Sequence, residues 1–126
     1  MTHHHIRLSV ALVVLLLASL ACRFFAADPG LVGTWQGSYE GDSIEITFGD
    51  DDRFEIYVGE SVTLGHYRVD MSTTPIQLDL VPDGGGAILT IIEFVDDDTL
   101  RMENTYNGQP RPTTFNDTAT FYRVNP

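Results

Sequence analysis

The sequence contains no lysine, a single cysteine and a single tryptophan in 126 residues. Because Cys22 has no second cysteine to pair with, no intramolecular disulfide can form. The sequence has eighteen acidic residues and seven arginines, so the formal net charge is −11. A chain this acidic is repelled by phosphates and by anionic lipid headgroups. We therefore expect no nucleic-acid partner and no membrane attachment through a basic surface.

Histidine is also scarce, because three of the four histidines lie at positions 3–5 and only His66 remains. Neither a zinc site nor a Cys-His dyad can be assembled from the residues after Cys22. A Ser-His-Asp arrangement is formally available, but His66 stands on an expected strand beside Gly65 with no nucleophile motif. Glu93 and Glu103 are a carboxylate pair suited to glycoside chemistry, although chance proximity is expected among so many acidic residues. We predict no catalytic residue, no metal and no cofactor.

The first 22 residues have the layout of an export signal. A short n-region ending in Arg7 precedes an uncharged apolar run from Leu8 to Ala21, which is shorter than the roughly 20 residues of a membrane span. A sole cysteine directly after that run, at Cys22, resembles the lipobox of bacterial lipoproteins, where the cysteine receives a diacylglycerol and becomes the N-terminus. Ser19 stands where leucine is usual, and ordinary cleavage after Ala21, which leaves a free thiol, is the alternative.

This interpretation divides the chain into a lipoprotein signal peptide over 1–21, a tether over 22–30 and one domain over 31–126. Six arginines and 18 acidic residues follow Cys22, which gives that part a formal net charge of −12. We expect a helix from about Ile6 to Cys22 with few contacts to the domain. The membrane would be a partner only through the acyl chains, on the bacterial cell envelope.

From Leu31 on, apolar and polar residues alternate between turn-forming clusters, and no segment has a helical period. Ile44, Ile46 and Phe48, for example, share one face. The expected strands are 31–39, 43–48, 53–58, 61–69, 76–81, 87–94, 99–106 and 118–124. The run from Ile88 to Ile92 does not alternate, which indicates a strand covered on both faces or a bulge. The pattern predicts an all-β, antiparallel domain of eight strands.

Two acidic turns repeat at the same spacing. Residues 48–56 match residues 94–102, and each contains three aspartates between two expected strands, which predicts two hairpins. Three consecutive carboxylates cannot all point at one ion, so solvated turns are favoured over calcium sites. The Asp83-Gly84-Gly85-Gly86 run is likewise expected to be a hairpin loop.

The first strand contains the Trp35 side chain on the same face as Gly33, Gly37 and Tyr39, so a bulky indole lies between two glycines that allow close approach. The Gly33-x-Trp35 motif, together with Arg123 on the last strand, resembles lipocalins, which are up-and-down β-barrels. In that family the tryptophan closes one end and the arginine lies across it.

A wider likeness covers most of 31–124. The segments 65–70, 75–80, 98–102 and 111–115, in this order, resemble a lipocalin-like family of small exported bacterial domains that is abundant in planctomycetes. The resemblance implies an eight-stranded antiparallel barrel closed by Gly33, Trp35 and Arg123, and it brings no catalytic residue.

The interior of such a barrel is expected to be nearly filled, because the candidate inward residues are large. They are Trp35, Tyr39, Ile44, Ile46, Phe48, Phe54, Ile56, Val58, Leu78, Leu80, Ile91, Leu100, Met102 and Phe121. Any pocket should be small and lie at the mouth far from Trp35, with Tyr67, Glu93 and Tyr106 as its lining. The expected function is a binding module for at most one compact apolar or amphipathic ligand. The alternative is a structural or interaction domain that acts through its acidic surface, with a filled barrel and no ligand.

Overall fold

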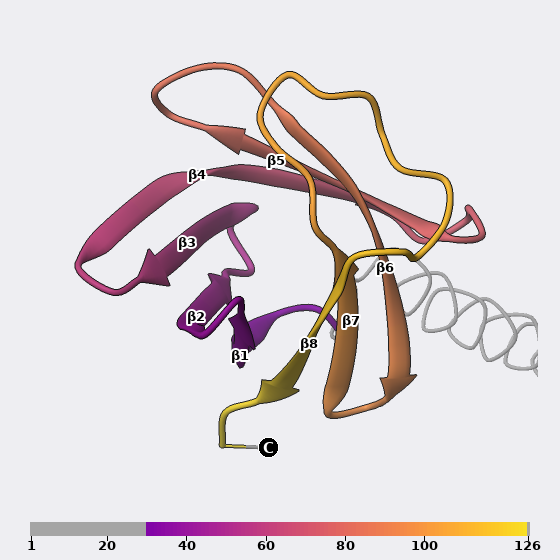
Figure 1. Ribbon diagram of the computed structural model, residues 1–126, viewed down its shortest axis with the longest axis horizontal. Coiled ribbons are helices and arrows are strands. Elements are labelled where there is room, and N and C mark those ends of the chain that lie inside the picture. The colour runs from indigo at the N-terminus through magenta and orange to yellow at the C-terminus, as the bar shows by residue number, and fades with distance from the viewer. Residues whose placement is uncertain (1–29, 126) are drawn as a thin grey trace, which may run out of the picture.

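The computed structural model describes residues 30–125, which form one closed barrel of eight antiparallel strands (Figure 1). The strands are β1 (Gly33–Tyr39), β2 (Asp42–Phe48), β3 (Arg53–Val58), β4 (Ser61–Asp70), β5 (Ile76–Pro82), β6 (Ile88–Asp96), β7 (Thr99–Glu103) and β8 (Thr118–Arg123). Each strand pairs with the next, and β8 pairs with β1. The prediction of an all-β, eight-stranded antiparallel barrel is confirmed. The expected signal peptide over 1–21, and with it the helix expected from about Ile6 to Cys22, lies outside the described residues.

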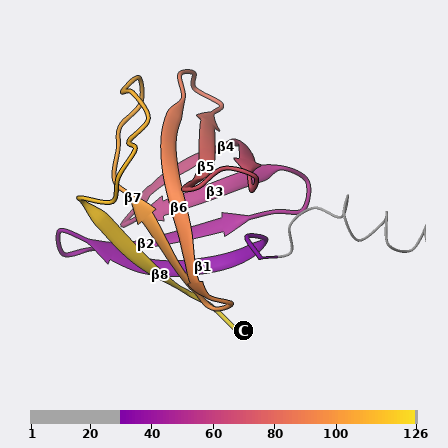
Figure 2. The same cartoon turned by 90° about the vertical axis from the view of Figure 1, so that its right-hand side faces the viewer.

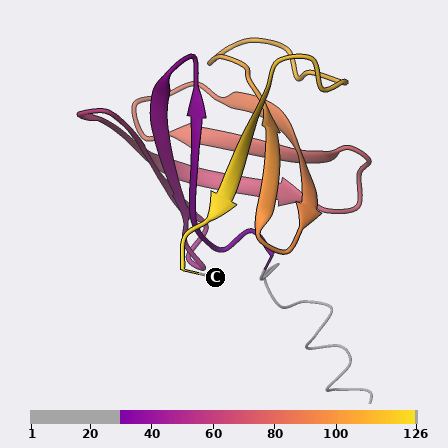
Figure 3. The same ribbon diagram turned by 60° about the horizontal axis from the view of Figure 1, so that its bottom comes forward.

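Up-and-down connectivity places the connections alternately at the two ends of the barrel. The turns at 49–52, 71–75 and 97–98 share one end with Gly30 and with the end of β8. The turns at 40–41 and 59–60, the β5–β6 connection and the long segment 104–117 share the other. Figure 3 shows this segment at the opposite end from the C-terminus, and Figure 2 gives the same arrangement from the side. None of the residues from 30 to 125 belongs to a helix long and apolar enough to cross a membrane.

The end that contains Trp35 is closed by side chains. Its indole is fully buried, and the indole nitrogen donates a hydrogen bond to the Leu31 carbonyl at 2.9 Å. The Arg123 guanidinium lies over the indole, 4.2 Å from the ring centroid. That guanidinium also donates to the carbonyls of Val32 and Gly30, at 3.0 and 2.6 Å. The packing of Trp35 against Arg123 that the resemblance implied is therefore present, and we call this the closed end.

Two glycines of β1 make the closure possible. Gly33 has a φ of 135°, and a Cβ there would lie 2.8 Å from a guanidinium nitrogen of Arg123. A Cβ on Gly37 would lie 2.6 Å from the Thr120 carbonyl oxygen. Both glycines therefore let β8 and its arginine approach β1 closely, as the alternation of glycine and tryptophan predicted.

The barrel interior contains the expected side chains with one exception. Ile91 is buried, but its pairing with Gln77 places it on the outer face, whereas Thr90 and Ile92 face inward opposite Leu78 and Met102. The expectation that Ile91 points inward is wrong. Three consecutive residues of β6, Thr90, Ile91 and Ile92, are buried, so an apolar side chain in this run does not indicate which face of the sheet it lies on. The non-alternating run is covered on both faces, and a register shift follows between Phe94 and Asp96.

The predicted strand 99–106 is also too long, since β7 ends at Glu103. The hydroxyl of Thr90 donates to the Glu103 carbonyl at 2.6 Å, and the Asn104 amide donates to the Asp117 carbonyl at 2.8 Å. These bonds turn the chain out of the β6 ladder. Pro110 and Pro112, which lack an amide hydrogen, then keep the segment 104–117 irregular.

Both acidic repeats form hairpins at the closed end. Phe48 pairs with Phe54 and Phe94 pairs with Leu100, so the equal spacing in sequence corresponds to equal spacing in the ladder. In each turn one aspartate accepts from a backbone amide two residues on: Asp51 from Arg53 at 3.2 Å and Asp96 from Asp98 at 2.9 Å. The carboxylates act as turn formers.

We predict that Trp35→Ala lowers the free energy of unfolding by about 3–5 kcal/mol, because it opens a cavity and removes the surface on which Arg123 lies. Urea titration followed by circular dichroism measures this loss. Tyr122→Ala is the control: Tyr122 is on β8 but 60% exposed, so its truncation should change stability by about 0.5 kcal/mol or less. Equal losses in the two variants would contradict the role given to the indole.

Candidate functional site

A cavity of about 150 Å³ lies in the barrel toward the end opposite Trp35, which we call the open end. Its wall is mostly apolar and comes from seven of the eight strands. The apolar lining residues are Ile44, Ile46, Ile56, Val58, Leu80, Ile88, Met102, Ala119 and Phe121. Tyr39, Thr90, Asn104 and Thr105 add polar groups. The cavity is about half the lower bound of ordinary ligand pockets, roughly 300 Å³.

The polar part of the rim is a hydrogen-bonded group made of Tyr39, Asn104 and Asp117. The Tyr39 hydroxyl donates to the Asp117 carboxylate at 2.6 Å, and the Asn104 amide donates to the same oxygen at 3.1 Å and to the Tyr39 oxygen at 3.0 Å. The hydrogen bond to Asp117 holds the pKa of Tyr39 well above its ordinary value, with help from burial and from the negative charge of that carboxylate. Tyr39 therefore remains a neutral donor across the physiological range.

Next to this group, Glu103 is a buried carboxylate with every oxygen occupied. It accepts from the backbone amides of Asn116, at 2.9 Å, and Asp117, at 2.9 and 3.0 Å, and from the Thr118 hydroxyl at 2.8 Å. Burial alone would raise the pKa of Glu103, but the amides of Asp117 and Asn116 and the hydroxyl of Thr118 together lower it below the ordinary value. The ionised Glu103 carboxylate thus fixes Asn116 and Asp117, which form the C-terminal end of the segment 104–117.

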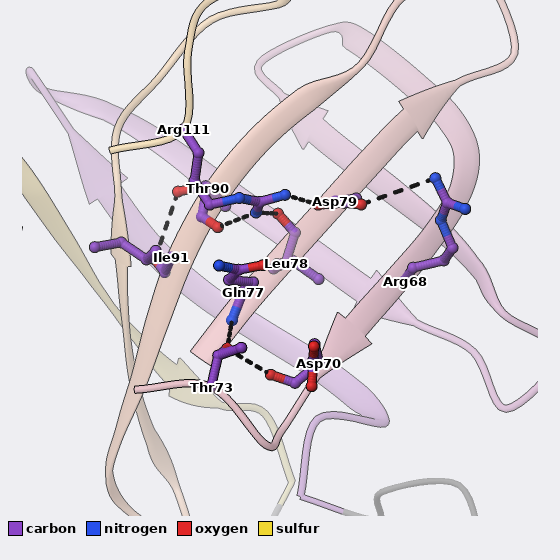
Figure 4. A network of polar contacts seen from close by, with 9 residues as sticks. All are labelled: Arg68, Asp70, Thr73, Gln77, Leu78, Asp79, Thr90, Ile91 and Arg111. Carbon is purple, nitrogen blue, oxygen red and sulfur yellow. Dashed lines mark hydrogen bonds and ion pairs between the residues drawn. The ribbon is translucent and has the colours of Figure 1, made fainter. Parts of the chain in front are cut away.

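The rest of that segment is fixed by Arg111. Its guanidinium donates to the Thr90 and Leu78 carbonyls, at 2.7 and 3.3 Å, and forms an ion pair with Asp79. Figure 4 shows Arg111 reaching across β6 to Asp79 on β5, with Arg68 of β4 on the far side at 3.8 Å. The segment therefore covers the outer face of β6 and leaves the mouth partly open.

The outer surface beside this network has a shallow hollow of about 280 Å³ between β4 and β5. Arg68, Val69, Asp70, Gln77 and Asp79 line it, and most of these side chains already bond to one another or to the turn (Figure 4). The Asp70 carboxylate accepts from the Ser72 amide and hydroxyl, and these bonds lower its pKa. The hollow is a surface feature of a turn, with its polar groups committed locally.

None of the three expected lining residues belongs to the cavity wall, so this part of the prediction is wrong, although the Tyr106 hydroxyl reaches the rim, 3.5 Å from the side-chain nitrogen of Asn104. Tyr67 lies toward the closed end, where its ring packs edge-on against Phe48 with centroids 5.0 Å apart and its hydroxyl donates to the Gly49 carbonyl at 2.6 Å. Glu93 is on the outer face of β6 and pairs with Arg101 at 3.1 Å. Tyr106 belongs to the segment after β7 and is 66% exposed. Because β7 ends at Glu103, Tyr106 is not on a strand that faces the interior. Glu93 is excluded from the cavity because its side chain points to the outer face of β6.

The other residues considered from the sequence have separate surroundings. His66 lies on the outer face of β4, where Arg53 is 3.1 Å and Asp83 3.8 Å from its ring. Glu93 and Glu103 each have their own partners, an arginine for the first and backbone amides for the second. Among residues 30–125, no group of three or more His, Cys, Asp or Glu side chains is placed to hold a metal ion.

Sequence reasoning missed Thr90, Asn104 and Asp117. Thr90 is a polar residue inside an apolar run, and Asp117 is 78 residues from Tyr39, so neither gives a local signal. Only the closure of β1 against β8 brings Tyr39 to Asp117.

Comparison of the chain with protein-family models, with curated proteins and with solved structures found no match. The cavity and its rim are therefore interpreted from their own geometry.

We predict that Glu103→Gln destabilises the domain by about 1–3 kcal/mol at pH 7, because an amide nitrogen would face backbone donors. The lowered pKa gives a pH dependence as well. The ionised carboxylate contributes stability fully above the unfolded pKa of about 4.3 and loses it as pH falls through the lower folded value. Stability should thus fall less between pH 5 and 3 in Glu103→Gln than in the wild type. Urea midpoints at both pH values measure this, with Glu93→Gln on the exposed outer face as the control.

Proposed function

We propose that the protein is a small lipocalin-like binding module, attached by lipid to the bacterial cell envelope, that takes one compact apolar or amphipathic molecule into its barrel. The observation that carries the proposal is the cavity at the open end. It has an apolar wall and a polar rim, which is the usual composition of a small-molecule site. The match of Gly33, Trp35 and Arg123 to the lipocalin pattern supports the family assignment.

Cavity size limits the ligand. An apolar cavity of about 150 Å³ holds a molecule of the size of benzene. A long-chain fatty acid is several times larger and would need the closed end to open, where Trp35, Phe48 and Phe54 are fully buried. We therefore propose a compact ligand, bound weakly because few of its atoms can be buried.

A filled barrel that acts through its acidic surface is the second candidate. The observation that favours an interaction domain is a contiguous exposed patch of the apolar side chains Tyr57, Val62 and Leu64 on β3 and β4. Tyr57 pairs with Val62, and Leu64 lies two residues further along the same face, opposite Glu55. Exposed apolar patches of this kind mark protein-interaction surfaces. The two candidates make opposite predictions about the cavity.

We predict that toluene shifts the methyl resonances of the isoleucines that line the cavity, Ile44, Ile46, Ile56 and Ile88, in a ¹³C-methyl spectrum. Ile91, which is buried on the outer face, is an internal control and should not shift. Ala119→Leu fills part of the cavity from β8 and should weaken toluene binding at least tenfold without unfolding the domain. Absence of shifts at saturating toluene would remove this proposal and favour the interaction domain.

Lipid attachment is the part of the proposal that depends on Cys22. Gly30 is held at the closed end by Arg123, so a tether over 22–30 would join the membrane to that end and leave the open end facing away. The acidic turns of the closed end would be repelled by anionic headgroups, which keeps the barrel off the surface.

We predict that Cys22→Ser moves the protein from the membrane fraction to the soluble fraction of a bacterial host. Incorporation of a labelled fatty acid into the wild type, and none into the variant, measures the modification itself. Recovery of soluble wild-type protein with an unmodified thiol would show ordinary cleavage after Ala21 instead.

A further inference from the structure

The rim of the cavity offers hydrogen-bond acceptors and negative charge. Tyr39 and Asn104 line the cavity, and both donate to Oδ2 of Asp117. Within the described residues, Oδ1 of Asp117 and Oδ1 of Asn104 accept no hydrogen bond from the protein. Asp117 does not itself line the cavity, but these bonds hold it beside two residues that do. The rim thus keeps two acceptor oxygens that the protein does not use, one of them on a carboxylate.

Among residues 30–125, no arginine is left without an acidic partner to compensate this carboxylate. All five arginines among residues 30–125 lie within 4 Å of an acidic side chain. The turns at the open end add the exposed carboxylates of Glu40, Asp42 and Glu60. The potential at the mouth is thus negative, which attracts cations and repels anions.

The apolar wall and this rim together define a ligand class. We propose that the cavity takes a primary amine with a compact apolar body, whose body lies among the isoleucines and whose ammonium group contacts Asp117 and Asn104. This inference rests on the proposed binding function and adds the charge of the ligand to it. An ammonium group has three donors and no acceptor, so it matches the free oxygens, whereas a carboxylate would face Asp117 with like charge.

The hydrogen bonds at the rim keep this arrangement ready for an amine. Tyr39 and Asn104 hold Asp117 in place through its other oxygen, so its Oδ1 need not be reoriented on binding. Because Tyr39 stays protonated, it donates to Asp117 and adds no second negative charge. The site thus combines one fixed carboxylate with an apolar pocket. A neutral hydrocarbon would contact only the pocket, and an acid would be repelled by the carboxylate.

The test compares four probes that share one ring: benzylamine, benzyl alcohol, toluene and benzoate. Dissociation constants are measured on the full chain, at pH 7 and low salt, from the Ile44, Ile56 and Ile88 methyl shifts. We expect benzylamine to bind about fivefold more tightly than benzyl alcohol, the upper end of the range for a solvent-exposed ion pair. Benzoate should bind most weakly, and 0.5 M salt should reduce the preference for the amine.

Variants locate the source of the preference. In Asp117→Asn the amine and the alcohol should bind within about twofold of each other, whereas Asp117→Glu should keep a preference for the amine. Asp50→Asn removes the same charge from an exposed turn at the closed end and should leave the preference intact.

Each result supports or overturns one statement. If benzyl alcohol and toluene bind the cavity but benzylamine binds no better, the amine inference is wrong and the proposed function stands. If Asp50→Asn lowers the preference as much as Asp117→Asn, general acidity explains it and the rim carboxylate does not. If none of the probes shifts the cavity methyls, the binding function and the amine inference both fail.

Discussion

The contact of Arg123 with Trp35 stabilises the closure of the barrel between β1 and β8, the two neighbouring strands with the fewest paired residues. β1 and β8 share three paired residues, fewer than any other two neighbouring strands, so backbone hydrogen bonds alone give little closure there. Arg123 adds bonds to Val32, Gly30 and the Asp97 carbonyl, at 2.6–3.2 Å, and covers the indole. One side chain therefore ties together the start of the domain, the β6–β7 turn and the last strand. The domain has no disulfide to do this, since its only cysteine is Cys22.

At the open end, two charged side chains fix an irregular segment: Glu103 at the end of β7 and Arg111 within the segment. Glu103 accepts from the backbone amides of Asn116 and Asp117, Arg111 donates to the Thr90 carbonyl, and these bonds fix the segment 104–117. A buried charge is costly unless it is hydrogen-bonded, and both oxygens of the buried Glu103 carboxylate are, while the partly buried Arg111 bonds to two carbonyls and to Asp79. The largest aromatic side chains, Trp35, Phe48 and Phe54, are fully buried toward the closed end, and the interior near the open end is left partly empty. The cavity lies at that end of the barrel.

The dimensions of the barrel and its charge together define the proposed role. Eight short strands enclose a space that large side chains fill near Trp35 and leave open near Tyr39. The excess of acidic residues keeps anions away from the mouth, and the apolar wall selects against polar molecules. A compact amine satisfies both conditions, and its affinity would be modest because so little surface is buried.

The sequence by itself determined the all-β class, the eight strands and the two acidic hairpins. These features depend on alternation, turn residues and spacing, which are local. The packing of Trp35 against Arg123 came from the family resemblance and not from a local pattern, since the two residues stand on the first and last strands. The sequence also predicted most inward-facing residues, because parity is unambiguous in alternating strands such as β2 and β3. Only the tertiary structure decided the parity of Ile91, the end of β7 and the residues at the cavity. Each depends on which segments meet after closure, such as Tyr39 with Asp117 or Thr90 with Glu103, and contacts over that separation leave no pattern in a single sequence.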